Sequence, residues 1–147
     1  ASHCRPRSPD CAPCPLAGTC LARASGNPEA FPSPPERRQR PHRHGIAWWT
    51  QREGSLWLVR RPEKGMLGGM AALPGPEWSS DAPAQPGLVT IRHGFTHFTL
   101  DLHVVPLREP SGSGWWQPLD GLSSAGLPTL YSKAAEAMLN REKQIAA

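Results

Sequence analysis

The first twenty residues hold a group of side chains that could do specific inorganic chemistry. All four cysteines of the 147-residue chain lie there, with the spacing C-x6-C-x2-C-x5-C: Cys4, Cys11, Cys14 and Cys20. Four thiolates in so short a segment can wrap a compact centre, and a cubane iron–sulfur cluster takes four cysteine ligands. Prolines between the cysteines stiffen the loop and reduce the entropy lost when a centre is bound.

On the residues alone, three interpretations of this cysteine loop stay open. Disulfides are the first, but secreted domains spread cysteines through the fold, and the chain shows no signal peptide. Structural zinc is the second, but zinc sites usually combine two close pairs, and Cys11 and Cys14 form the only close pair here. An iron–sulfur cluster is the third, and it uses all four thiolates.

A second candidate site lies in the tripeptide Phe95-Thr96-His97, just before an alternating strand, where we expect the tip of a hairpin. The hydroxyl and the imidazole can donate and accept hydrogen bonds, so this pair can bind the edge of a nucleobase. Phe95 offers an apolar face of the kind that separates stacked bases. The alternative is an ordinary turn with a buried phenylalanine and a surface histidine.

The elements that must position this tripeptide are strands followed by one helix. Apolar and polar residues alternate from Phe98 to Val104, which predicts a strand with one apolar and one polar face. From Pro128, apolar residues recur on one helical stripe, so we predict a helix there. We therefore expect an α+β domain with a mixed sheet. The other predicted strands are residues 44–50, 55–61, 88–93 and 114–117, with a turn at 51–54.

The front third of the chain differs in charge and in proline content. Residues 1–44 hold seven arginines against three acidic residues, whereas residues 45–147 are neutral overall. Half of the 18 prolines also lie in residues 1–44, and residues 23–43 have almost nothing apolar to bury. We expect this stretch to be a semi-extended connector whose basic residues contact phosphates. The candidates are Arg37, Arg38, Arg40 and Arg43, with His42, His44 and His93 as weaker ones.

The cysteine spacing resembles the iron–sulfur loop of the endonuclease III and adenine glycosylase family of base-excision DNA repair enzymes. Pro15-Leu16 after the third cysteine and Ala22 after the fourth add to the match. The resemblance implies a [4Fe–4S] cluster held by the four cysteines. In that family a helical domain precedes the loop. We therefore expect the chain to be a fragment whose N-terminal helical catalytic domain is missing.

Two further segments resemble the C-terminal domain of adenine DNA glycosylases, the MutY family. The first is Arg61-Pro-Glu-Lys-Gly-Met-Leu-Gly-Gly-Met70, and the second is Arg92-His-Gly-Phe-Thr-His-Phe-Thr-Leu-Asp101. The three motifs cover nearly the whole chain in the family's order. The resemblance divides it into an iron–sulfur loop (1–22), a connector (23–43) and a Nudix-like domain (44–147) that recognises 8-oxoguanine.

The resemblance also implies what the whole protein does. An adenine DNA glycosylase hydrolyses the N-glycosidic bond of adenine paired with 8-oxoguanine in double-stranded DNA. Its catalytic glutamate and aspartate belong to the helical domain, so no catalytic residue is expected in this chain, and the fragment alone should be inactive. Phe95, Thr96 and His97 would recognise the lesion, although Thr96 stands where serine is usual. We expect a bacterial, cytoplasmic, DNA-associated monomer without membrane contact.

The rival hypothesis is a Nudix-type nucleotide hydrolase with a zinc-binding loop. Such hydrolases hold magnesium with a glutamate-rich helix, which should follow Gly69. The chain has only Glu77 and Asp81 there, and four prolines between residues 74 and 86 disfavour a long helix. We therefore expect the scaffold without its metal site. An electron-transfer protein is a third and weaker hypothesis, because residues 44–147 offer no second redox centre.

Overall fold

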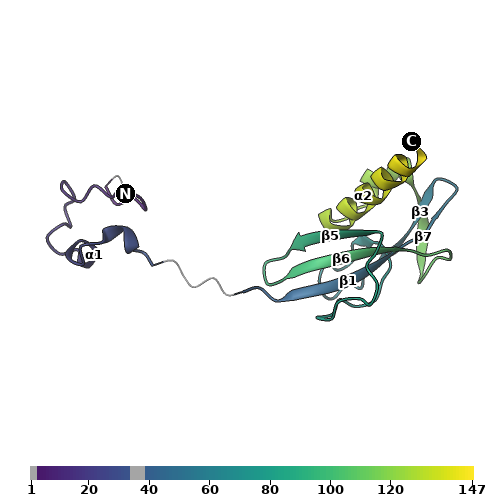
Figure 1. Ribbon diagram of the computed structural model, residues 1–147, viewed down its shortest axis with the longest axis horizontal. Coiled ribbons are helices and arrows are strands. Elements are labelled where there is room, and N and C mark those ends of the chain that lie inside the picture. Colours follow the sequence, from purple (N-terminus) through teal and green to yellow (C-terminus); the bar gives the residue numbers. More distant parts are fainter. Residues whose placement is uncertain (1–2, 34–38) are drawn as a thin grey trace. The chain divides into compact units, whose positions relative to one another are not determined.

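The computed structural model describes residues 3–33 and 39–147, which belong to two compact units, Ala1–Gln39 and Arg40–Ala147. The first unit is irregular and holds one short helix, α1 (Leu21–Ala24), and one 3-10 turn, η1 (Pro28–Ala30) (Figure 1). The backbone N–H of Ser8 donates a 2.8 Å hydrogen bond to Glu29 Oε1, which ties the front of this unit to η1. The predicted phosphate contacts Arg37 and Arg38 lie outside the described residues.

The second unit contains two small sheets and a C-terminal helix. In the first sheet β1 pairs parallel with β6, and β6 pairs antiparallel with β5. In the second sheet β3 lies between β2, β4 and β7, all antiparallel to it. The strands are β1 (His42–Trp49), β2 (Gln51–Arg52), β3 (Ser55–Arg60), β4 (Ala71–Ala72), β5 (Val89–Gly94), β6 (Thr99–Pro106) and β7 (Gly114–Pro118); η2 (Leu119–Ser124) and α2 (Thr129–Ala146) follow.

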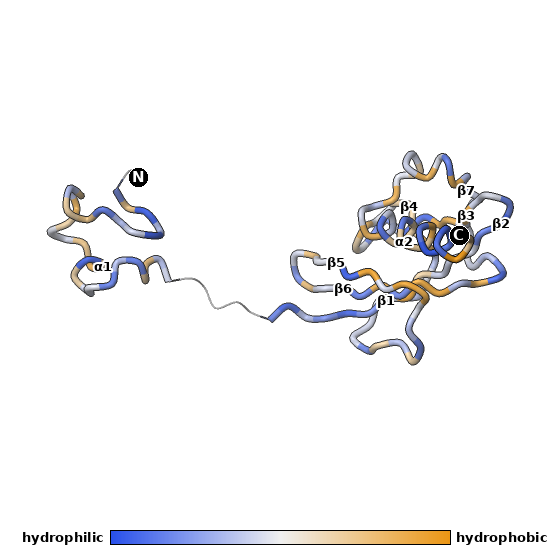
Figure 2. The backbone as a smooth tube through the Cα atoms, turned by 45° about the horizontal axis from the view of Figure 1, so that its top comes forward, coloured by the Kyte–Doolittle hydropathy of each residue, from blue (hydrophilic) through white to orange (hydrophobic). Residues whose placement is uncertain are grey.

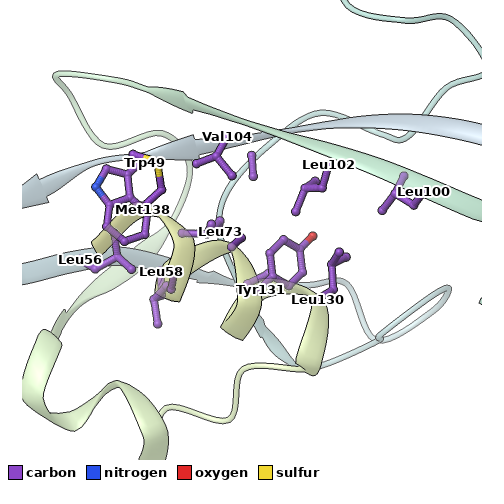
Figure 3. Close-up of a cluster of buried hydrophobic side chains, with 14 of the residues drawn as sticks. Trp49, Leu56, Leu58, Leu73, Leu100, Leu102, Val104, Leu130, Tyr131 and Met138 are labelled. Atoms are coloured by element: carbon purple, nitrogen blue, oxygen red, sulfur yellow. The ribbon is translucent and has the colours of Figure 1, made fainter. Parts of the chain in front are cut away.

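The core lies between the apolar faces of the strands and helix α2. Leu100, Leu102 and Val104 alternate along β6 and are fully buried, as the period of a strand requires. Tyr131 and Leu130 of α2 pack into the same cluster (Figure 3). Figure 2 shows the same division along the chain, with hydrophilic residues at the start of β1 and apolar ones where the strands approach α2.

The predicted α+β fold with a mixed sheet is confirmed, and so are the five predicted strands and the helix, with shifts of one or two residues at their ends. Asp101 lies on the polar face of its strand, as the alternation predicts, and it is only 8% exposed because Arg92 and His42 cover it. Among the described residues, no helix has both the length and the apolar character needed to cross a bilayer.

Candidate functional site

The tripeptide Phe95-Thr96-His97 lies in the tight turn between β5 and β6, as predicted. Gly94 pairs with Thr99, and the N–H of Phe95 donates a 2.8 Å hydrogen bond to the carbonyl oxygen of Phe98. This closure fixes the turn at the end of a two-stranded ribbon. The side chains of Thr96 and His97 are exposed at its tip, where they are free to contact a ligand.

Phe95 is placed differently from its two neighbours, because its ring is half-buried. Its centroid lies 4.8 Å from the ring of Phe98, 4.8 Å from that of His93 and 5.6 Å from that of Trp78. Arg40 adds a 3.2 Å hydrogen bond from Nη1 to the carbonyl oxygen of Phe95. The aromatic packing and the arginine therefore hold the turn in place.

A cavity of about 410 Å³ opens beside this turn. Its wall combines Arg43 from β1, the segment 61–66 that follows β3, Trp78, and His97 with Phe98 from the turn. The parallel pairing of β1 with β6 brings residue 43 next to residue 100, which explains why such distant segments meet. Two of the segments that carry the sequence resemblance thus line one cavity.

The charge of the cavity wall is mainly positive. Arg43, Arg61 and Lys64 line it, whereas Glu77 is the one carboxylate among its lining residues. The guanidinium of Arg43 lies 4.8 Å from the centroid of the Phe98 ring, and that of Arg61 lies 4.7 Å from the Trp78 ring. Stacking of this kind holds a guanidinium in place while leaving its edge available for hydrogen bonds.

Segment 61–70 forms a compact loop that presents Arg61. The N–H of Arg61 donates to the carbonyl oxygen of Met70 at 2.9 Å, and Arg61 Nε donates to the carbonyl oxygen of Met66 at 3.0 Å. A Cβ at Gly68 would collide with the carbonyl of Glu63, and Gly69 has a φ of +69°. These two glycines therefore allow the tight backbone of this loop.

The segment that follows β4 contains no helix between Leu73 and Leu88, all of which the structure describes. It runs instead along β1, where Trp48 N–H donates to the carbonyl oxygen of Pro74 at 2.7 Å, and His44 forms a β-bridge with Ser79. Glu77 and Asp81 are exposed in this irregular stretch. The prediction that the prolines prevent a long helix here is confirmed.

The four cysteines of the first unit surround a second cavity, of about 300 Å³. None of them forms a disulfide. Backbone hydrogen bonds fold the loop around them, from Ala17 N–H to Cys14 O and from Ala24 N–H to Cys20 O, both 3.0 Å. All four cysteines therefore line one common space.

The sequence-based candidates are thus only partly brought together. His97 and Arg43 line the cavity, Thr96 lies beside it on the turn, and His42 and His44 belong to a separate polar cluster with Asp101. Sequence reasoning missed Arg61, Lys64 and Trp78 as cavity residues. The resemblance had pointed to segment 61–70 as a whole, but its side chains had no assigned role.

Comparison with known families agrees with this fold. A family model described as a NUDIX domain matches residues 45–137. The chain belongs to the NUDIX domain family. The matched span of this NUDIX domain runs from Gly45 in β1 to Ala137 in α2, so it includes both sheets and the turn.

The chain is also similar to solved structures at low sequence identity. The MutT protein from Methanosarcina mazei Go1 is 16% identical over 72% of this chain and 98% of that chain, with a TM-score of 0.55. The C-terminal domain of mouse MUTYH, solved in complex with human PCNA, is 18% identical over 70% and 89%, with a TM-score of 0.45. A Nudix hydrolase from M. smegmatis, RenU, is 16% identical over 74% and 90%, with a TM-score of 0.47. At these identities the likeness concerns the fold alone.

Proposed function

We propose that this chain is the lesion-recognising, C-terminal part of an adenine DNA glycosylase that binds 8-oxoguanine paired with adenine. One observation carries the proposal: the two NUDIX-domain segments that resemble the MutY family, 61–70 and 92–101, line one positively charged cavity. Residues 71–91 separate these segments in sequence, and the fold brings them to the same cavity. The cysteine loop, whose spacing resembles the same enzymes, adds independent support.

The chemistry of the turn suits this lesion. Guanine presents N7 as a hydrogen-bond acceptor in the major groove. Oxidation at C8 places a hydrogen on N7 and adds a carbonyl oxygen, so the same edge then offers a donor beside an acceptor. The hydroxyl of Thr96 can accept from that N7–H, and the imidazole of His97 can donate to a carbonyl. Both side chains are exposed on a turn that Phe95 and Arg40 hold in place.

The basic residues of the cavity would bind the DNA backbone on either side of the lesion. Arg43 and Arg61 are each stacked on an aromatic ring, so little side-chain entropy is lost when they contact a phosphate. Lys64 adds an exposed point charge on the same rim. Such contacts orient the duplex and make binding depend on salt, while the turn supplies the discrimination.

The four cysteines would hold the [4Fe–4S] cluster that the resemblance implies. The residues fit this group, because the four thiols are free and line one common cavity. When bound, a cluster of this kind would crosslink the loop rigidly through its four cysteines, and it could also take up or release an electron. The loop itself places Arg23 at the cavity wall, where it could present positive charge to DNA.

Removal of the adenine requires a helical domain outside these 147 residues, because the resemblance assigns the catalytic glutamate and aspartate to that domain. The adenine must leave the base stack before its glycosidic bond can be reached. The present chain would contribute by holding the opposite strand at the lesion. In this proposal the protein works as a DNA-associated monomer, and the 147 residues bind DNA without excising a base.

A binding experiment tests the proposal directly. Fluorescence anisotropy would compare the affinity of the chain for two labelled duplexes of the same sequence. One duplex carries an 8-oxoguanine:adenine pair, and the other carries a guanine:adenine pair at the same position. We expect tighter binding to the lesion, and the double variant Thr96→Ala/His97→Ala should reduce the ratio of affinities by about tenfold, because two hydrogen bonds are lost. Ser113→Ala, an exposed hydroxyl in a loop away from the turn, is the matched control. Equal affinity of the parent chain for both duplexes would contradict the proposal.

Membership of the NUDIX domain family supports a second candidate, a magnesium-dependent nucleotide hydrolase. It would have to use Glu77 and Asp81, the two carboxylates between β4 and β5. Their irregular segment offers no helix to align them, which is why we rank this candidate second. A phosphate-release assay with nucleoside triphosphates and magnesium separates the two. Turnover that disappears in Glu77→Gln/Asp81→Asn would establish the hydrolase instead.

A further inference from the structure

The polar face of the sheet β1-β6-β5 carries a cluster of side chains that the proposed function leaves unused. The strand register places His44 opposite Asp101 and Asp101 opposite Arg92. His42 extends to the same carboxylate from two residues earlier in β1, with 3.0 Å between its Nε2 and Asp101 Oδ2. One ligand atom from each of His42, His44 and Asp101 lies within 4.8 Å of the other two.

We propose that His42, His44 and Asp101 form a binding site for a divalent transition-metal ion of the zinc type. Two imidazoles and one carboxylate are the ligands that zinc accepts, at about 2.0–2.2 Å, with a water in the fourth position. Ligand atoms at such bond lengths lie roughly 3.4 Å apart, so small side-chain rotations suffice. The side chain of His42 is 40% exposed and has room to make them.

The neighbouring hydrogen bonds orient His44 as metal-binding histidines require. Its Nδ1 lies 3.3 Å from His103 Nε2, and His103 Nδ1 lies 3.1 Å from Thr90 Oγ1. If each imidazole donates from Nδ1 along this chain, Nε2 of His44 keeps its lone pair. A ligand histidine whose other ring nitrogen donates to a fixed partner is the usual arrangement at protein metal sites.

The ion would replace a proton between His42 and Asp101. At present one proton joins His42 Nε2 to Asp101 Oδ2. When His42 carries its proton on Nδ1 instead, Nε2 and the carboxylate oxygen both face the shared position with lone pairs. The Asp101 carboxylate keeps its two 2.8 Å hydrogen bonds from Arg92, which hold it in orientation. The positive charge of the guanidinium also repels a metal ion. Arg92 therefore orients the Asp101 carboxylate but lowers the affinity of the site for the ion.

Zinc titration of the full chain tests this proposal, in a background where the four cysteines are replaced by alanine so that thiolates cannot compete. These cysteines belong to the first compact unit, whereas His42, His44 and Asp101 belong to the second. In competition with a chromophoric chelator, we expect one zinc ion per chain. His42→Ala and His44→Ala should each weaken binding by at least about tenfold, and Thr90→Val should weaken it by a smaller factor through His103. Arg92→Gln should tighten it.

The matched control is His97→Ala, an exposed histidine of the same unit outside the cluster, which should leave the affinity for zinc unchanged. Far-UV circular dichroism would show that each variant is folded, and the exposed position of His42 makes it the safest one to interpret. Absence of zinc binding by the parent chain overturns the proposal. An affinity that His42→Ala and His97→Ala alter equally overturns it as well.

Discussion

Arg61 and Tyr131 are joined by a 3.0 Å hydrogen bond from Arg61 Nη1 to the hydroxyl oxygen of Tyr131, across seventy positions of sequence. The tyrosine ring is 2% exposed and belongs to the core beneath helix α2, as Figure 3 shows. The same guanidinium lies over Trp78 at the wall of the positively charged cavity. The packing of the C-terminal helix therefore helps to set the position of a cavity arginine.

Tyr131→Phe tests this coupling. The variant keeps the packed ring but removes the hydroxyl that accepts the hydrogen bond from the charged Arg61 side chain. We therefore expect the free energy of unfolding to fall by about 1–2 kcal/mol. The Arg61 side chain would keep its hydrogen bond to the carbonyl oxygen of Met66 but lose the one to Tyr131, so DNA affinity should fall as well. Urea unfolding and duplex binding measure the two effects. Asn140→Ala, at an exposed position of α2, should change neither, and an unaltered midpoint in Tyr131→Phe would contradict the coupling.

The ionisation of Tyr131 gives a prediction at high pH. Burial raises the pKa of this phenol above its ordinary value near 10, despite the opposing effect of Arg61. The unfolded chain then loses the proton at a lower pH than the folded chain, so the unfolded state binds fewer protons above pH 10. Stability should be intact below about pH 10 and fall as pH rises beyond it. Tyr131→Phe should lack this part of the alkaline loss in urea unfolding at increasing pH.

The local elements could be predicted from the sequence, whereas their partners could not. The alternation from Phe98 to Val104 reports which residues face a core, because the period of a strand is two. Nothing in that alternation indicates that β6 pairs parallel with β1, more than fifty residues earlier. The two-residue strands β2 and β4 are too short to show any period, so they were missed.

The candidate site divides in the same way. The turn at Thr96 and His97 could be located because it precedes a clear strand. The involvement of Trp78 could not be foreseen, since it lies in an irregular stretch and reaches the cavity only through tertiary packing. The burial of Asp101 could not be foreseen either. The alternation places this residue on the polar face of β6, but it does not show that charged partners on both neighbouring strands cover it.

The pair of Asp101 and Arg92 gives a prediction at low pH. Hydrogen bonds from Arg92, opposed by burial and aided by His42, lower the pKa of the Asp101 carboxyl from 3.8 to about 2. Because the pKa of Asp101 is lower in the folded chain than in the unfolded chain, its charge stabilises the folded state at pH values above the unfolded-state pKa. This stabilisation is lost as the pH falls from about 4 toward 2. We expect on the order of 1 kcal/mol, since Arg92 is 72% exposed and water screens the pair.

Urea unfolding of the parent and of Asp101→Asn between pH 7 and pH 2 measures this contribution. The difference between the two free energies of unfolding should shrink as the pH falls through that window. Glu109→Gln is the matched control, because its ion pair with Arg52 is 3.5 Å long and largely exposed. A difference that stays constant down to pH 2 would show that Asp101 does not stabilise the fold through its charge.

The core gives a prediction of stability alone. Leu102 is fully buried between the sheet and α2, so Leu102→Ala should cost about 2–5 kcal/mol by lost transfer energy and the cavity left behind. Leu88→Ala removes the same atoms at a position that is 46% exposed, and it should cost far less. Thermal unfolding followed by circular dichroism compares them. Equal shifts of the midpoint would mean that this packing does not hold the domain together.

The cysteine loop gives the last prediction, which concerns what the four thiolates bind. The chain should be brown and absorb visible light when it is produced with iron–sulfur assembly proteins and purified without oxygen. It should contain four irons and four sulfides, because each of the four thiolates binds one iron of a [4Fe–4S] cluster. Cys14→Ser should lose both colour and iron, whereas Thr19→Ser, inside the same loop, should keep them. A colourless chain that carries zinc on these cysteines would contradict the cluster, because the zinc would occupy the four thiolates that a four-iron cluster needs.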